Sequence, residues 1–456
     1  MLTRTANGDS RTSFWRRVRE YAVPPSMIET ATARRQVGDW AGACSAAHVE
    51  VDFRLRDVAH THGRELAGRL RADLRQLAPD LLRWHLPRTA PDGLLRPGLT
   101  MALARYGAEV AEPPGPLFLV VRTPPAWASY GQRISLALWS PSNDGGPRLH
   151  PHPRPGRRFR FDLHRHLWDA GRSGELRARS GADREAPTEL PGTALGVLAE
   201  RCAVDRWAAE AAILLSAEGR PAGPVAVRLG RGRRLVLEPD GGVTASPAEA
   251  HDGPHALPLL PDAATWVLPD LDLLRTGAIE ADRLHPLVAQ ALAPDRPAGT
   301  APSGAEQPER PGRPQLVECR GARHRIGLVD GVLAPLDHSP AELRREELLA
   351  ALSGTPLPCL QAVDRAHRTP QSLTGVQERL DHGDIAGALA IVEGLLGPGA
   401  VLRPGPLRDE LEAAAQRRIG YGLYRAGLAG PAPFRVLPGP QRPARHRSHP
   451  RHTTGR

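Results

Sequence analysis

Apolar positions that recur every three to four residues indicate helices over the first part of the chain. Two such stripes are present, one of Trp40, Ala43, Cys44 and Ala47 and one of Leu66, Leu70, Leu74 and Leu77. Ser26 and Glu29 have the spacing of a capping box, which predicts a helix that starts near Met27. We therefore expect a helical segment over 24–90, and a disordered segment over 1–23 before it.

The pattern changes near residue 97, where short apolar runs alternate with connections rich in proline and glycine. The runs LTMALARY, PLFLVVRT and RISLALW predict antiparallel strands. RRFRFDLH, at 157–164, alternates strictly and predicts a strand with its aromatic residues on one face. After a helical stretch around 195–217, a Gly-Arg-Gly turn joins two further strands. These features predict an α+β domain with antiparallel strands over 97–292.

The composition changes again beyond residue 292. Residues 293–314 hold too little apolar surface to fold, which predicts a flexible linker. A small hairpin and a helical module are then expected over 315–428, with Ser339, Pro340 and Glu342 marking the start of one helix. The segment 429–456 is expected to be a basic disordered tail. The fold class expected for the whole chain is α+β, with helical segments at both ends and a mainly antiparallel β middle.

Two distant segments share a Gly-Asp pair followed by Ala-Gly-Ala. They are RRQVGDWAGACSAA at 34–47 and RLDHGDIAGALAIV at 379–392. Each resembles the helical hairpin of tetratricopeptide-type repeats, although no period near 34 residues connects them. The alternative is that glycine ends one helix and aspartate starts the next. Both interpretations predict helix breaks at Gly38-Asp39 and Gly383-Asp384, and we expect Trp40 and Ile385 to face inward.

The composition excludes several classes of enzyme. Apolar residues make up 41% of the 456 residues, and the 60 basic residues are all arginine. A P-loop and a protein kinase both need a lysine, and Schiff-base chemistry needs an amine that can lose its proton. The bias toward Ala, Arg, Pro and Gly, with segments such as VPPSMIETATARRQVGDW, is similar to that of uncharacterised actinobacterial proteins. That resemblance implies no activity.

The net charge of +10 is concentrated in two places. The tail over 431–456 contains arginines and no acidic residue, and the strip over 148–179 is also rich in arginine. Arginine suits phosphate contacts, so weak binding of nucleic acid or another polyanion is one possible function. The tail lacks interleaved aromatic residues for base stacking, and no nucleic-acid-binding motif is present.

The cysteines and the N-terminus suggest a cellular location. Cys44, Cys202, Cys319 and Cys359 lie far apart, which predicts neither a zinc module nor a disulfide framework. The chain starts without an apolar signal region and has no 18-residue apolar run, so we expect a reduced, soluble, cytoplasmic protein without a membrane partner. Cys359 and His367 have the spacing of a reactive thiol–imidazole pair, although packing explains such a cysteine equally well.

The candidate metal ligands are Asp162, His164 and His166 in FRFDLHRHLWDA. If the strand continues through 166, these three side chains project from one face, and two imidazoles with a carboxylate suit iron, zinc or manganese. The neighbouring arginines oppose a cation, so the alternative is a half-buried strand with a solvated basic face. Any other cofactor is unknown from the sequence.

By elimination, the sequence predicts a non-catalytic scaffold or protein–protein interaction function with an unknown protein partner, and no catalytic residue is assigned. The alternatives are a metal-dependent enzyme that uses Asp162, His164 and His166, or weak polyanion binding through the arginine-rich segments. Whether the protein is an enzyme stays open at this point.

Overall fold

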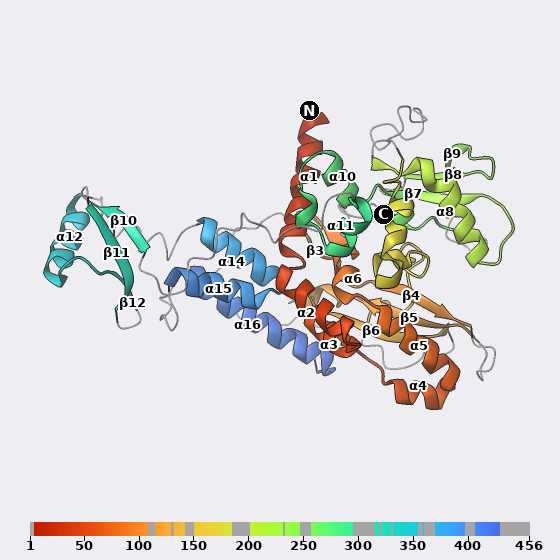
Figure 1. The fold of residues 1–456 in the computed structure, drawn as a ribbon, viewed down its shortest axis with the longest axis horizontal. Coiled ribbons are helices and arrows are strands. Elements are labelled where there is room, and N and C mark those ends of the chain that lie inside the picture. The colour runs from red at the N-terminus through yellow and green to blue at the C-terminus, as the bar shows by residue number, and fades with distance from the viewer. Residues whose placement is uncertain are drawn as a thin grey trace. The chain divides into compact units, whose positions relative to one another are not determined.

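A computed structural model describes residues 4–107, 115–128, 132–141, 150–184, 201–230, 233–246, 257–294, 315–319, 322–329, 332–353, 359, 370–396 and 406–428. The chain is an α+β protein, in which helical segments precede and follow a mainly antiparallel β middle (Figure 1). It divides into two compact units, one with the described residues up to 294 and the other with those from 315 to 428.

The first unit contains a four-stranded sheet in the order β1-β6-β5-β4. Its strands are β1 (Val49–Val51), β4 (Thr100–Tyr106), β5 (Leu117–Arg122) and β6 (Ile134–Trp139). β4, β5 and β6 pair antiparallel, as their apolar runs predict. β1 joins β6 in parallel, with Val49 opposite Ile134. Since β1 comes from the segment 24–90, the change of pattern near residue 97 does not separate two folded bodies.

Helices from the first 85 residues pack with this sheet. They are α1 (Arg4–Tyr21), α2 (Pro25–Gln36), α3 (Trp40–Ala46), α4 (Leu55–His62), α5 (Arg64–Gln76) and α6 (Pro79–His85). The predicted leucine stripe of α5 is buried, with Leu70 and Leu74 completely inaccessible. Both belong to the same core cluster as Leu103 of β4 and Leu119 of β5. The helical period therefore correctly predicts which face of α5 packs inward.

A second, smaller core in the same unit has its own sheet. β7 (Val225–Gly230), β8 (Arg233–Leu237) and β9 (Val243–Ser246) pair antiparallel, as predicted, and α8 (Val204–Ala217) packs with them. Trp207 and Leu214 of α8 form this core with Val225 and Val227 of β7. Figure 1 shows β7–β9 and α8 together in yellow-green, apart from the orange four-stranded sheet.

The remaining elements of the first unit are short. They are β2 (Arg88–Thr89), β3 (Leu94–Leu95), α7 (Leu176–Ser180), α9 (Asp262–Thr265), α10 (Pro269–Arg275), α11 (Pro286–Leu292), and the 3-10 turns η1 (Ala126–Ala128), η4 (Arg165–Leu167), η5 (Ala170–Glu175) and η8 (Ala281–Arg283). These short elements contribute to both cores. Leu167, Leu176 and Val288 pack in the larger core, and Ala264 packs in the smaller one.

The second unit holds an antiparallel sheet and several helices. Its elements are β10 (Gln315–Cys319), β11 (Ala322–Val329), β12 (Val332–Pro335), α12 (Pro340–Ser353), α14 (Pro370–His382), α15 (Ile385–Leu396) and α16 (Pro406–Arg425). The start of α12 confirms the predicted capping box. The Ser339 amide donates to Glu342 Oε2 at 2.9 Å, and the Glu342 amide donates to Ser339 Oγ at 3.2 Å.

The two Gly-Asp segments form the same local structure. Gly38 and Gly383 have positive φ values of 79° and 86°, and helices α3 and α15 begin two residues later. Asp39 Oδ1 accepts from the Gly42 amide at 2.8 Å, and Asp384 Oδ1 accepts from the Gly387 amide at 2.9 Å. Both predicted breaks are thus confirmed.

Glycine in the first turn after each break leaves room for the capping aspartate. A Cβ added at Gly42 would lie 2.1 Å from a carboxylate oxygen of Asp39, and one at Gly387 would lie 2.2 Å from an oxygen of Asp384. The inward orientation expected for Ile385 is wrong, because that side chain is 39% exposed, whereas Trp40 is half-buried against the larger core.

The strand expected over 157–164 does not form. The segment runs beside β4, where the Gly156 amide donates to Thr100 O and the Asp162 amide donates to Ala102 O. It then turns, because the Leu163 amide donates to Arg160 O at 3.1 Å. The aromatic face is buried as expected, but the alternation ends at this turn, and residues 165–167 form η4.

Two expectations for the N-terminus are wrong. Residues 4–21 form α1 instead of a disordered segment, and α2 begins at Pro25 without a side-chain cap from Ser26. The expected linker, tail and His367 lie largely or wholly outside the described residues. In the part of the chain that the structure describes, no helix combines the length and the apolar character needed to cross a membrane.

A buried ion pair attaches α1 to the rest of the first unit. Arg19 donates to Asp270 Oδ2 of α10 at 2.7 Å, and the two side chains are 2% and 0% exposed. Trp84 Nε1 of α6 donates to the other carboxylate oxygen at 3.0 Å. The Arg19 guanidinium also stacks on the Trp84 ring at 4.5 Å. This set of contacts, here called the Arg19–Asp270 pair, joins three helices.

We predict that Asp270→Ala destabilises the protein by about 3–5 kcal/mol, because it leaves the Arg19 charge buried without its partner. Chemical unfolding monitored by tryptophan fluorescence measures the change. Asp272→Ala on the same helix is the control, since that carboxylate lies 3.8 Å from Arg11 and its side chain is 36% exposed. The control should cost less than about 1 kcal/mol, and equal losses in the two variants would contradict the prediction.

Candidate functional site

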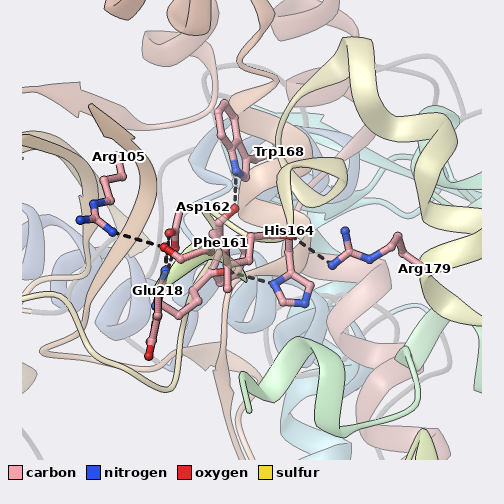
Figure 2. Close-up of polar contacts among 10 residues, drawn as sticks. Arg105, Phe161, Asp162, His164, Trp168, Arg179 and Glu218 are labelled. Atoms are coloured by element: carbon pink, nitrogen blue, oxygen red, sulfur yellow. Dashed lines mark hydrogen bonds and ion pairs between the residues drawn. The ribbon is translucent and has the colours of Figure 1, made fainter. Parts of the chain in front are cut away.

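The structure brings together only two of the three predicted metal ligands. The rings of His164 and His166 contact each other with centroids 5.7 Å apart, and Asp162 points away from His164 (Figure 2). Asp162 is held by Arg160, whose Nε and Nη2 donate to the carboxylate at 2.9 and 2.8 Å. Figure 2 shows Asp162 on the side of Glu218 and His164 on the side of Arg179, so the two side chains diverge from the turn. The predicted metal site depended on all three side chains projecting from one face, and this arrangement is not present.

His164 is fixed by contacts within the protein. Its Nδ1 lies 2.9 Å from Arg160 O, and its Nε2 lies 3.3 Å from Glu210 Oε2. Arg179 donates to both oxygens of Glu210, at 2.6 and 2.7 Å. Burial raises the pKa of Glu210, but the hydrogen bonds from His164 and Arg179 outweigh it and lower the pKa to about 2. Glu210 is thus a carboxylate that binds Arg179 and lies against His164.

Four of the eight described arginines of the basic strip pair with acidic residues from outside it. Arg158 binds Asp262 at 2.6 Å, and Arg160 binds both Asp162 and Glu218. Arg165 bridges Asp73 and Asp169. The charges of Arg158, Arg160 and Arg165 are thus neutralised inside the first unit instead of forming a solvated basic face.

Part of this strip lines a cavity of about 360 Å³ in the first unit. The wall comes from α1, α6, the turn at 158–161, η4, α7, α8 and the residues around α9 and α10. Its arginines are Arg11, Arg19, Arg158, Arg160, Arg179, Arg201 and Arg206. Asp262 is the acidic residue among the described residues that line it. We call this cavity the arginine–histidine pocket.

Besides Arg19, whose Nε is buried without a partner although its other nitrogens are bonded, three side chains of the pocket carry buried polar atoms without a hydrogen-bond partner. They are Nε2 of His85, Nδ1 of His166, and Nε and Nη1 of Arg206. His166 and Arg206 are only 3% and 6% exposed. Such groups are costly to bury, at about 1–3 kcal/mol each, unless something satisfies them. These unsatisfied nitrogens indicate that the pocket could bind a ligand that accepts hydrogen bonds.

The charges on the wall are not fully compensated. Five of its arginines have an acidic partner, and the partners of Arg11 and Arg19 are Asp272 and Asp270. Arg201 and Arg206 form no ion pair with any described residue. Burial lowers the pKa of Arg206 although Glu210 and Asp205 lie near enough to raise it. The pocket therefore holds positive charge in a desolvated position.

The two histidines of the wall are neutral at physiological pH. Burial lowers the pKa of His85 to about 3. Burial also lowers the pKa of His166 well below its usual value, and the neighbouring His164, Arg179 and Arg206 add to the effect. His85, His166 and Arg206 all line this pocket. Each neutral imidazole can offer one N–H to a ligand, depending on its tautomer.

Aromatic rings supply the apolar part of the wall. Trp15 of α1, Trp84 of α6 and Trp266 beside α9 line the pocket together with Phe159 and Phe161. The Arg19 guanidinium lies over the ring of Trp15 at 5.3 Å as well as over Trp84. A flat apolar body could pack between such rings while an oxyanion meets the nitrogen donors.

Sequence reasoning located only part of this site. The strip over 148–179 and His166 were singled out, but Asp162 and His164 lie outside the pocket lining. His85, Arg206 and Trp266 were missed, because each comes from a different segment and no local motif marks it. Buried polar atoms become visible only when the tertiary packing is known.

Comparison of the chain with protein-family models, with curated proteins and with solved structures finds no match.

We predict that His166 makes the protein less stable in acid. The unfolded imidazole binds a proton below about pH 6.5, whereas the lowered pKa of His166 keeps the folded form neutral, so stability falls as pH falls through that range. Between pH 7.5 and 5.0, this group contributes a loss of at most about 2 kcal/mol.

Urea unfolding at the two pH values tests this prediction. His166→Gln should lose less stability than the wild type on acidification, since the residue that must bind a proton on unfolding is gone. His60→Gln, at an exposed site of α4, should keep the full pH dependence. An unchanged slope in His166→Gln would show that the effect comes from other groups.

Proposed function

We propose that this protein binds a small organic anion in the arginine–histidine pocket. The observation that carries the proposal is that His85, His166 and Arg206 line one pocket and that each has a buried nitrogen without a partner within the described structure. An oxyanion accepts several N–H groups at once, so it would satisfy all three side chains. The excess of arginine over acid on the wall favours the same sign of charge.

The rest of the wall suggests the class of ligand. Trp15, Trp84 and Trp266 favour a flat apolar or aromatic body, and the volume of about 360 Å³ admits a small molecule instead of a polymer. The expected ligand is therefore an aromatic or other apolar molecule with one carboxylate or phosphate. The oxyanion would meet Arg206 and the imidazoles, while the rings would contact the apolar body.

Binding assays can separate the two kinds of oxyanion. Aryl carboxylates, nucleoside monophosphates and inorganic phosphate are screened by thermal shift, and the hits are quantified by isothermal titration calorimetry. Arg206→Met keeps the apolar stem but removes the charged donor, so Kd should rise by roughly 10- to 100-fold, as expected for a charged hydrogen bond worth about 1.5–3 kcal/mol.

Arg220→Met is the matched control, because Arg220 is exposed at the end of α8 and lies outside the pocket. It should leave Kd unchanged. If none of the three ligand classes binds, or if Arg206→Met binds as well as the wild type, the proposed function is wrong.

We propose protein–protein interaction as a second function, as the sequence predicts. The observation that favours it is the exposure of Ile385 and Leu389 on α15, at 39% and 42%. The hairpin of α14 and α15, with its Gly383-Asp384 break, resembles one tetratricopeptide-type unit, and such hairpins present a helix face to partners. Polyanion binding through the tail over 431–456 stays a prediction outside the described residues.

We predict that replacing both exposed residues, Ile385→Gln with Leu389→Gln, abolishes capture of a specific partner without unfolding the protein. Quantitative affinity purification from the native host compares this variant with the wild type. Leu348→Gln on α12 is the control, since Leu348 is 69% exposed but belongs to another helix. Identical sets of captured proteins for all three forms would contradict this function.

A further inference from the structure

We infer that the second unit contains a zinc site formed by His324, His338 and Cys359. One ligand atom from each residue lies within 4.8 Å of the other two. The site is distinct from the arginine–histidine pocket, which belongs to the first unit. It also shares no residue with Asp162, His164 and His166.

The two imidazoles have no other explanation in the described structure. Their rings stack at 4.4 Å with an angle of 7° between the planes. Nδ1 of His324 and Nε2 of His338 are buried without a hydrogen-bond partner. Two adjacent unsatisfied nitrogens cost free energy, and a metal ion would satisfy both at once. The Cys359 side chain is completely buried beside them.

Hydrogen bonds fix the residues on both sides of His338. Asp337 accepts from the Arg325 amide at 2.6 Å and from Arg325 Nη2 at 2.6 Å, so the turn is tied to the residue next to His324. Ser339 forms the capping box that starts α12. His338 therefore sits between two fixed residues, and Asp337 is a positioning residue whose carboxylate is occupied by Arg325. Such preorganisation is typical of metal sites.

The types of ligand atom at this site indicate which metal it would bind. Two imidazoles and a thiolate suit zinc or copper, and in blue-copper sites a distant methionine commonly completes the set. The three methionines of the chain are Met1, Met27 and Met101, and none belongs to the second unit. Zinc with a water molecule in the fourth position fits this composition. Ligand atoms in a tetrahedral zinc site are roughly 3.4–3.7 Å apart, so small side-chain rotations would close the site.

Binding of zinc would join three separate segments. His324 lies on β11, His338 lies in the turn between β12 and α12, and Cys359 follows α12 along the chain. The Cys359 thiol would lose its proton on binding, so affinity should fall in acid. Small modules of this kind often depend on a metal for part of their stability.

Cobalt substitution tests the inference directly. Untagged full-length protein is stripped with EDTA and titrated with Co²⁺, and a parallel sample is loaded with Zn²⁺ for elemental analysis. The expected results are one tightly bound Zn²⁺ per chain, intense visible bands of tetrahedral Co²⁺, and a near-ultraviolet thiolate-to-cobalt band. Histidines of the tail cannot produce the thiolate band, so the readout is specific for a cysteine ligand.

Variants assign the ligands. Cys359→Ser should abolish the thiolate band, and His324→Asn and His338→Asn should each weaken Co²⁺ binding at least 100-fold. Cys202→Ser, which changes a buried cysteine of the first unit, should leave the spectrum unchanged. Absence of the thiolate band in the wild type, or its persistence in Cys359→Ser, overturns the inference. If Cys359→Ser fails to fold by circular dichroism, the wild-type spectrum and the two histidine variants decide.

Discussion

The Arg19–Asp270 pair is the interaction on which the larger part of the structure depends. One carboxylate, completely buried, receives the Arg19 guanidinium and the Trp84 indole, so α1, α6 and α10 must dock together. Burying two charges costs solvation energy, and the pair tolerates that cost because both oxygens of Asp270 are hydrogen-bonded. The same contacts place Trp15, Trp84 and Arg19 on the wall of the arginine–histidine pocket. The Arg19–Asp270 pair thus fixes both the packing of these helices and part of the pocket wall.

Local patterns in the sequence predicted what local physics controls. The leucine stripe of α5, the capping box at Ser339 and both Gly-Asp breaks depend on neighbouring residues, and all are present. The alternation over 157–164 failed because a hydrogen-bonded turn and the Trp168 indole, which donates to Phe161 O, overrode the strand pattern. The N-terminal segment was predicted to be disordered, but Phe14, Trp15 and Val18 pack with the larger core and α1 is also held by the buried charge of Arg19. No periodicity reveals such a residue.

The candidate sites, too, could not be predicted from local sequence patterns. His85, His166 and Arg206 come from three separate segments, and so do His324, His338 and Cys359. Their chemistry arises only when distant parts of the chain fold together, so spacing along the sequence carries no signal for it. Of the three residues that do have suggestive spacing, Asp162 is held away by Arg160, whereas the rings of His164 and His166 contact each other with centroids 5.7 Å apart. The spacing therefore predicted one of the contacts in this set but not the set as a whole.

The first helix contributes Arg11, Trp15 and Arg19 to the pocket wall. A molecule bound there would contact α1 and the body of the unit at the same time, so its binding energy would also hold that helix in place. By mass action, each tenfold rise of ligand above its Kd adds about 1.4 kcal/mol to the docked state. Ligand binding in the pocket would then make the N-terminal helix more resistant to proteases and to hydrogen exchange.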